Sequence, residues 1–170
     1  MKISNHNQRG FTLLEMVVSV ALITVGTLGV FSAVTKYSQY TQQSKDNFTA
    51  VYLCQEGIEI VKNIRDTNWI IGGATTWKDG LTICASGCEA DFEDTVLTPW
   101  TSGSDLYIEY SAGQPTFYRY LASPTSNDVK TPYKRKIIIS DVSADEIHVQ
   151  VDVYWDSHTM TVKENLYNWK

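Results

Sequence analysis

Histidine and cysteine, on which much enzyme chemistry depends, are scarce in this sequence of 170 residues, which has 3 of each. His6 lies close to the N-terminus, and His148 and His158 fall in a predicted strand and a predicted turn. The sequence has no Gly-x-Ser-x-Gly motif, no Walker loop and no His-Glu-x-x-His motif. These absences argue against an enzyme, and we expect no catalytic residues, no metal site and no cofactor.

An excess of basic residues is also missing, since 14 lysines and arginines stand against 19 acidic residues, for a net charge of −5. Nucleic-acid binding is therefore not favoured, because it depends on Lys and Arg contacts with phosphates.

The length and the 43% hydrophobic content indicate one ordinary globular domain. We interpret the one basic cluster as a strand edge kept soluble by charge. It consists of Lys130, Lys134, Arg135 and Lys136.

Charge is nearly absent between Phe11 and Val34, where Glu15 is the one charged side chain. The apolar run from Met16 to Val34 is close to the ~20 residues that cross a bilayer as a helix, and Lys36 marks its far boundary. A secretory signal peptide would have a shorter apolar run of about 7–15 residues. A cleavage site with small residues would follow that run, and no such site is present here. A plain membrane anchor explains the length but not Glu15, because a carboxylate inside the bilayer costs about 3 kcal/mol or more.

The segment Arg9-Gly10-Phe11-Thr12-Leu13-Leu14-Glu15 resembles the processing site of type IV prepilins and pseudopilins. The resemblance implies that a prepilin peptidase cuts after Gly10, so that residues 1–10 are a leader peptide, and that the new N-terminal Phe11 is N-methylated. It also implies that Glu15 is the glutamate on which filament assembly depends. The implied partners are the prepilin peptidase, other pilin or pseudopilin subunits, an inner-membrane assembly platform, and the membrane, which residues 11–35 would cross once.

The spacing of Phe11 and Glu15 suits such a role. Cleavage after Gly10 would give Phe11 a free amine, and Glu15 follows four residues later on the same helix face. A buried amine and a buried carboxylate are each costly alone and much less costly as a pair. Glu15 is expected to bind its own amine, the N–H groups of the first helical turn, or, in a filament, the amine of a neighbouring subunit. The span lacks the proline of many pilins, and Gly26 and Gly29 are its weak points.

An amphipathic pattern follows the apolar run and predicts that the helix continues to about Arg65. Interruptions are expected at most near residues 42–45 and at Gly57. Residues 36–66 are therefore assigned to an amphipathic helix that continues into a head domain, with Cys54 as a small buried hydrophobe. The predicted apolar stripe consists of Tyr37, Tyr40, Phe48, Val51, Cys54, Ile58, Val61 and Ile64.

Strand and turn patterns replace the helical pattern in residues 67–170, where we predict an antiparallel β head. The fold class is α+β and pilin-like, with a long N-terminal helix whose apolar stripe packs on a C-terminal antiparallel sheet. In residues 147–155 the apolar side chains alternate cleanly with polar ones, as in a half-buried strand. The predicted strands are 81–85, 106–110, 117–121, 133–140, 147–155 and 160–166, with a hairpin turn around 112–115 and a tight turn at 156–158.

Cys84 and Cys88 lie close together and are expected to form a disulfide in an oxidising compartment. The loop that this disulfide closes is short, so it would contribute about 2 kcal/mol at most. A zinc site would need more thiol or imidazole ligands than this pair. An acidic run follows, which we interpret as a solvated loop; calcium is the alternative, although no EF-hand spacing is present. The run comprises Glu89, Asp91, Glu93 and Asp94.

The sequence favours a structural subunit, and a minor one, of a type IV pilus or a type II secretion-like pseudopilus, and it is equally compatible with a DNA-uptake filament. The stretch from Gln55 to Trp69 resembles the helix end of minor pilins and pseudopilins, and the ending Tyr167-Asn168-Trp169 resembles many pilin-like proteins. The expected location is the bacterial inner membrane, with the C-terminal domain outside the cytoplasm, and then the filament. The alternative is a membrane-tethered adhesin or receptor that binds a ligand through the tyrosines of its β domain, Tyr107, Tyr110, Tyr118 and Tyr120.

Overall fold

The computed structural model describes residues 10–73, 76–101, 104–111 and 113–169. Residues 1–9 of the expected leader peptide and Ala112 of the expected hairpin turn lie outside the described residues. The chain divides into two compact units, Met1–Lys45 and Asp46–Lys170. Helix α1 (Leu13–Ile71) is the element of secondary structure that is described in the first unit, and it continues into the second unit.

Helix α1 is continuous over 59 residues and has no break at residues 42–45 or at Gly57. Its sequence contains no proline, so no residue of the helix lacks a backbone N–H donor. The helix extends past the expected end near residue 66 and stops at Ile71. Gly72 and Gly73 follow with φ of 57° and 74°. This left-handed conformation ends a helix, and glycine adopts it without steric cost.

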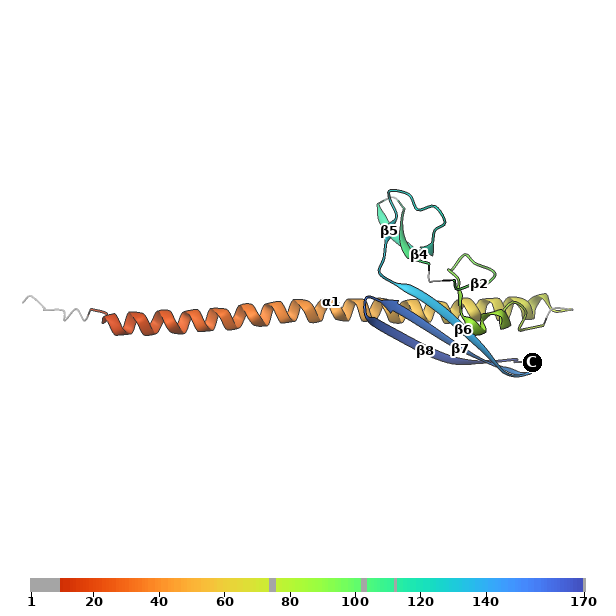
Figure 1. The fold of residues 1–170 in the computed structure, drawn as a ribbon, viewed down its shortest axis with the longest axis horizontal. Coiled ribbons are helices and arrows are strands. Elements are labelled where there is room, and N and C mark those ends of the chain that lie inside the picture. Colours follow the sequence, from red (N-terminus) through yellow and green to blue (C-terminus); the bar gives the residue numbers. More distant parts are fainter. Residues whose placement is uncertain (1–9, 74–75, 102–103, 112, 170) are drawn as a thin grey trace, which may run out of the picture. The chain divides into compact units, whose positions relative to one another are not determined.

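The second unit also contains two antiparallel sheets (Figure 1), with strand orders β2-β1-β6-β7-β8 and β4-β3-β5. The predicted hairpin and the predicted three-strand meander are both confirmed. The meander strands are β6 (Lys134–Ser143), β7 (Glu146–Trp155) and β8 (His158–Tyr167). The shorter strands are β1 (Cys88–Glu89), β2 (Thr98–Pro99), β3 (Leu106–Ser111), β4 (Gln114–Tyr120) and β5 (Val129–Lys130).

The core of the second unit lies between the C-terminal part of α1 and the meander, which run side by side in Figure 1. The predicted alternation in β7 is confirmed, since Ile147, Val149, Val151 and Val153 are all completely buried. The buried side of α1 comprises Ala50, Leu53, Cys54, Gly57, Ile58, Ile60, Val61 and Ile64.

The predicted stripe on α1 is correct in its second half and wrong in its first. Tyr37, Tyr40 and Phe48 are exposed, and the first buried residue of α1 is Ala50. Aromatic residues at helical spacing give the same pattern whether or not a sheet covers them. The periodicity shows which residues share a face of the helix, but it does not show whether anything packs on that face.

Residues 81–85 do not form the predicted short strand, because Thr82–Ser86 is a 3-10 helix, η1. The β-branched Thr82 and Ile83 favour a strand locally. The Cα atoms of Cys84 and Cys88 are 5.1 Å apart, whereas four extended residues would separate them by roughly 13 Å. The chain must therefore curl between the two cysteines, and Gly87, with φ of 110°, completes the reversal.

Candidate functional site

The first turn of α1 is capped by Thr12. The Glu15 N–H donates to Thr12 Oγ1 at 3.3 Å, and the Met16 N–H donates to the Thr12 carbonyl at 3.2 Å. Thr12 is thus the N-cap and Glu15 is the third helical residue, the Thr-x-x-Glu spacing of a capping box. The positive end of the helix dipole favours a carboxylate at this position. Thr12 is not among the predicted site residues, although the Thr-x-x-Glu spacing is visible in the sequence.

The residues of the expected cleavage site, Gly10 and Phe11, precede the helix and are exposed. A Cβ added at Gly10 would meet no atom within 4 Å. Among the described residues, Glu15 forms no ion pair, and its side chain is exposed. The structure thus places an accessible non-helical dipeptide directly before a capped helix start, and the carboxylate in its first turn has no ion-pair partner among the described residues.

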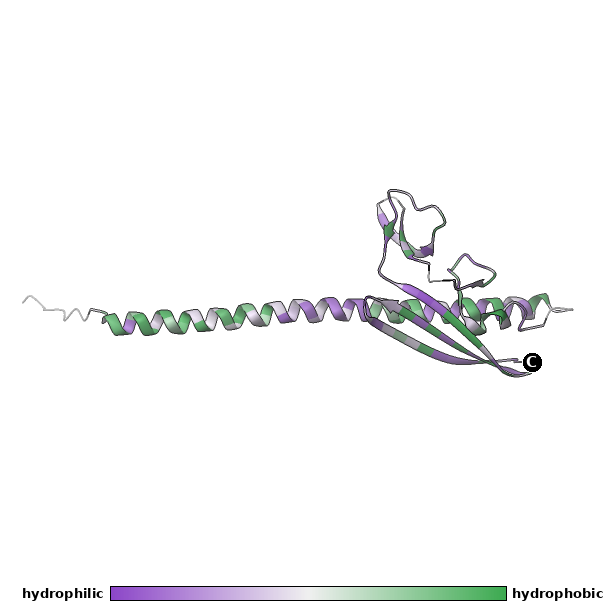
Figure 2. Cartoon of the chain, in the orientation of Figure 1, coloured by the Kyte–Doolittle hydropathy of each residue, from purple (hydrophilic) through white to green (hydrophobic). Residues whose placement is uncertain are grey.

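The apolar segment after Glu15 has no protein cover within the first unit. Its side chains are exposed, except for the half-buried Ser19, and Figure 2 shows hydrophobic residues around the helix over most of this segment. α1 is the one described helix that is long and apolar enough to cross a membrane. An uncovered apolar surface of this size needs lipid or other apolar helices as its surroundings.

Four hydroxyl groups within this segment bond to the helix itself. Ser19, Thr24, Thr27 and Thr35 each donate a hydrogen bond to the carbonyl four residues earlier, at 2.7 to 3.0 Å. These four hydroxyls therefore need no water as an acceptor. Such internal partners suit a helix in a bilayer, where polar groups must be satisfied inside the protein.

The four residues of the predicted basic cluster do not form one basic surface. Arg135 is completely buried and forms an ion pair with Glu56 of α1 at 3.0 Å. Lys130 and Lys134 both pair with Asp105, at 2.5 and 3.7 Å. Arg135 is thus a structural residue of the core, so its interpretation as part of an exposed strand edge is wrong, and Lys130 and Lys134 share the one carboxylate of Asp105.

The acidic run is a hydrogen-bonded loop rather than a merely solvated one. Asp91 is 5% exposed, and its carboxylate accepts the N–H groups of Glu93 and Tyr120, each at 3.0 Å. Asp94 in turn accepts the Asp91 N–H at 2.8 Å, and Glu93 pairs with Arg119. Among the described residues, no group of three or more His, Cys, Asp or Glu side chains is arranged to hold a metal ion.

The tyrosines of the alternative ligand surface differ in their environments. Tyr110 is exposed, while Tyr107, Tyr118 and Tyr120 are half-buried. The Tyr120 hydroxyl donates to the Arg135 carbonyl at 3.1 Å, and burial raises the pKa of this phenol to about 12. Tyr118 packs edge-on against another ring of the head. At least two of the four rings therefore stabilise the head itself.

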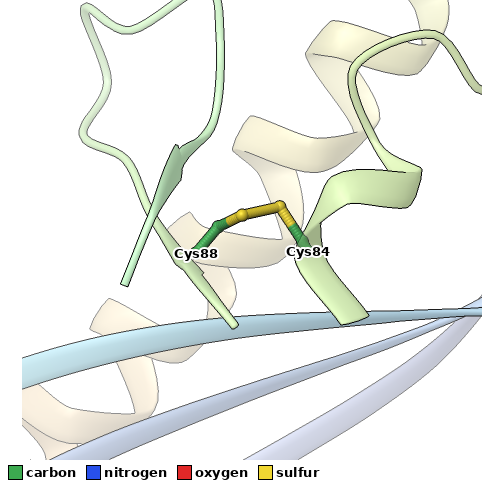
Figure 3. The surroundings of a disulfide bond; sticks show 2 residues. All are labelled: Cys84 and Cys88. Carbon is green, nitrogen blue, oxygen red and sulfur yellow. A yellow bond between two sulfur atoms is a disulfide. The ribbon is translucent and has the colours of Figure 1, made fainter. Parts of the chain in front are cut away.

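All three cysteines are buried inside the second unit. The predicted disulfide between Cys84 and Cys88 is present and links η1 to β1 (Figure 3), with both residues completely buried. Cys54 is free and buried, with its Sγ 3.7 Å from the Val151 carbonyl and 3.6 Å from the Met160 carbonyl. Burial raises the pKa of the Cys54 thiol to about 11, so it stays protonated and unreactive at neutral pH.

Residues 5–31 match a family model described as the prokaryotic N-terminal methylation motif. The match covers the segment that contains Gly10, Phe11, the Thr12 cap and Glu15, together with most of the apolar run. Searches of curated proteins and of solved structures gave no match for any part of the chain. The matched residues thus belong to the N-terminal segment of the chain, before the head domain.

Proposed function

We propose that this chain, whose N-terminus carries the methylation motif of the type IV pilin and pseudopilin family, is a structural and minor subunit of a pilus or a pseudopilus. The observation that carries the proposal is the helix start. A capped first turn presents the Glu15 carboxylate, and a long apolar surface follows with no cover of its own.

Assembly would follow from the charges at this helix start. Prepilin peptidase would cut between Gly10 and Phe11, and the freed Phe11 amine would be methylated and would keep its positive charge. Glu15 would then pair with the amine of a neighbouring subunit, which removes two unpaired charges from apolar surroundings and fixes the axial register between subunits. The apolar helices would leave the lipid together and form the core of the filament.

The proposed topology divides the chain into a leader (residues 1–10), a membrane and filament-core segment (11–35), an amphipathic segment of the same helix (36–66) and a head (67–170), into which the last residues of α1 extend. The head would lie outside the cytoplasm, because the Cys84–Cys88 disulfide requires an oxidising compartment. The partners would be the prepilin peptidase, other subunits of the same filament and a membrane assembly platform.

The variant Glu15→Gln tests the assembly role. Glutamine keeps the capping-box spacing and removes the charge, so the helix start should form as before. We expect the variant to be processed and inserted normally but to be absent from sheared filaments, as measured by immunoblotting. The control Glu59→Gln removes an exposed carboxylate from the part of α1 that lies in the second unit. This variant should enter filaments at the level of the unmodified chain.

Two results would contradict the proposal. Normal incorporation of Glu15→Gln would remove the assembly role and would favour a membrane-tethered receptor, which has no need of Glu15. Intact-mass measurement tests processing separately, because the mature chain should begin at Phe11 and carry one added methyl group. A mature chain with another N-terminus would overturn the processing assignment.

A further inference from the structure

The second unit contains an open groove of ≈ 320 Å³ between helix α1 and the loop that joins β1 to β2. This volume falls within the range of about 300–1,000 Å³ that is typical of ligand sites. The residues that line the groove, and their neighbours in the sequence, all belong to the described part of the chain. The lining consists of Glu56, Glu59, Ile60 and Asn63 of the helix and Phe92, Glu93, Asp94 and Thr95 of the loop.

Apolar surface is present in the groove and directly beside it. Ile60 is 7% exposed and belongs to the core, whereas Phe92 keeps 41% of its surface exposed. The ring of Phe92 contacts that of Phe117, which is 56% exposed, with the two ring centroids 4.6 Å apart. Exposed aromatic rings that lie together are typical of interaction sites, where aromatic residues are enriched.

The lining carries carboxylates and no cationic side chain. Three of these carboxylates pair with cations that lie outside the lining, as Glu56–Arg135, Glu59–Lys62 and Glu93–Arg119. Lys62 and Arg119 are each shared with a further carboxylate, that of Glu164 and that of Glu109. Asp94 accepts the Asp91 N–H at 2.8 Å and forms no ion pair among the described residues. The charge around the groove is therefore negative on balance and complementary to a cationic occupant.

The chain itself shows how a basic side chain is accommodated beside the groove. The guanidinium of Arg119 lies 5.8 Å from the centroid of the Phe92 ring and forms ion pairs with Glu93 and, at 3.0 Å, with Glu109. Aromatic ring and carboxylates thus hold one guanidinium together, through a cation–π contact and charge-assisted hydrogen bonds. The carboxylate of Glu59, which is 71% exposed, and that of Asp94 are accessible to a second cation.

We propose that this groove binds a basic and partly apolar peptide segment of another protein. Lysine or arginine side chains of the segment would pair with Glu59 and Asp94, and an apolar side chain would cover the exposed surface of Phe92 and Phe117. A polyamine would satisfy the carboxylates but would leave the rings exposed to water. The proposal goes beyond the assembly role, since the groove lies in the second unit and binding there does not require that the chain enters a filament.

The test uses the full chain, labelled with fluorophenylalanine and placed in nanodiscs of zwitterionic lipid, because anionic lipid would compete for a basic peptide. The signals of the 5 phenylalanines are assigned by single Phe→Leu variants and followed by fluorine NMR. The probe is the capped peptide Leu-Lys-Leu-Arg, and its controls are Leu-Gln-Leu-Gln and Leu-Glu-Leu-Glu. With the basic peptide we expect saturable shifts of the Phe92 and Phe117 signals, with a Kd on the order of 1 mM or tighter. The signals of Phe11, Phe31 and Phe48 should not change.

A matched pair of double variants locates the binding. Glu59→Gln with Asp94→Asn removes two charges from the groove, and Asp145→Asn with Glu146→Gln removes two charges where the chain passes from β6 to β7. Each amide keeps an oxygen that can accept the hydrogen bonds of the carboxylate it replaces, such as the bond from the Asp91 N–H to Asp94. The groove variant should bind the basic peptide roughly tenfold more weakly, whereas the other variant, which has the same net charge, should bind it as the unmodified chain does.

Four results would overturn the proposal. The first is the absence of saturable shifts at peptide concentrations of about 10 mM, or equal shifts with the neutral peptide. The second is an equal affinity of the two double variants, which would leave only the overall charge of the protein as the cause of binding. The third is tighter binding of spermidine or Ca²⁺ at the same signals, which would identify a site for a small cation. The fourth is a change of the Phe92 and Phe117 signals with protein concentration in the absence of peptide, which would make a second copy of this chain the occupant.

Discussion

The buried guanidinium of Arg135 and the carboxylate of Glu56 form an ion pair of 3.0 Å that joins strand β6 to helix α1. Arg135 also donates to the carbonyl of Leu53 at 3.1 Å and to that of Ala90 at 2.6 Å. One side chain thus connects the helix, the sheet and the loop after β1. Because Arg135 is completely buried, its charge depends on these partners for its stabilisation.

Replacing Glu56 by glutamine should therefore destabilise the head. Breaking a buried ion pair by removing one partner costs about 3–5 kcal/mol; the Glu56 side chain is 30% exposed, so we expect roughly 1–3 kcal/mol. Urea unfolding of the full chain in detergent, followed by tryptophan fluorescence, measures the difference. Glu59→Gln is the control, because Glu59 is 71% exposed in its pair with Lys62 and should cost no more than about 0.5 kcal/mol. Equal losses in both variants would contradict the role given to Arg135.

Gly57 marks the place where the sheet comes closest to α1. A Cβ at this position would lie 2.9 Å from Val151 Cγ1 and 3.2 Å from Arg135 Cδ. Gly57→Ala should lower the free energy of unfolding by about 1–3 kcal/mol through overpacking, even though alanine favours a helix by about 1 kcal/mol. Gly29→Ala meets no atom within 4 Å and should leave urea unfolding of the head unchanged. A stabilised Gly57→Ala variant would show that helix propensity outweighs the contact.

Strand β7 on one side, and Gly57 and Arg135 on the other, show which features of the fold the sequence predicts and which it does not. The alternation of apolar and polar residues in β7 predicts its buried face. Successive side chains of a strand point to opposite faces, so in a sheet that is covered on one side the apolar set is the buried set. The sequence predicts at Gly57 a possible interruption of the helix and at Arg135 one charge of an exposed basic cluster. Both interpretations fail for one reason: a close approach and a buried ion pair are properties of two segments that lie far apart in the chain.

The N-terminal site was predictable to a greater extent because its signals are local. Helix capping, the position of Glu15 and the apolar run all lie within one short stretch of sequence, so no distant partner is needed to recognise them. The groove beside Phe92 is the opposite case. It requires α1 and the loop between β1 and β2 to meet, and no single stretch of sequence contains it.

Alkaline pH should destabilise the head through its buried tyrosines. Burial raises the pKa of Tyr120 to about 12 and that of Tyr133 to about 12, above the ordinary value of about 10. The folded state thus holds these protons more tightly than the unfolded state. Their contribution to stability is complete below pH ~10 and is lost as the pH rises from about 10 through 12. Urea midpoints measured across this range should fall with pH.

The variant Tyr120→Phe isolates one of these groups. It removes the hydrogen bond to the Arg135 carbonyl, which should cost about 1 kcal/mol at neutral pH. It also removes one titrating phenol, so the fall in stability above pH ~10 should be less steep than in the unmodified chain. An unchanged slope would mean that Tyr120 ionises equally in the folded and unfolded states and would contradict its burial.

The Cys84–Cys88 disulfide should contribute modestly to stability, because the two cysteines are only 4 residues apart. The loss of loop entropy in the unfolded chain then amounts to about 2 kcal/mol, which is the decrease expected for the double variant Cys84→Ala and Cys88→Ala in urea unfolding. Both cysteines are completely buried, so a reductant should act on the unmodified protein only after it unfolds. Adding reductant during unfolding should bring the unmodified protein close to the double variant and should leave the double variant unchanged, since Cys54 has no second thiol in that chain. A reductant effect on the double variant, or equal stability of the two proteins without reductant, would show that the disulfide does not restrict the unfolded chain as its position in the sequence predicts.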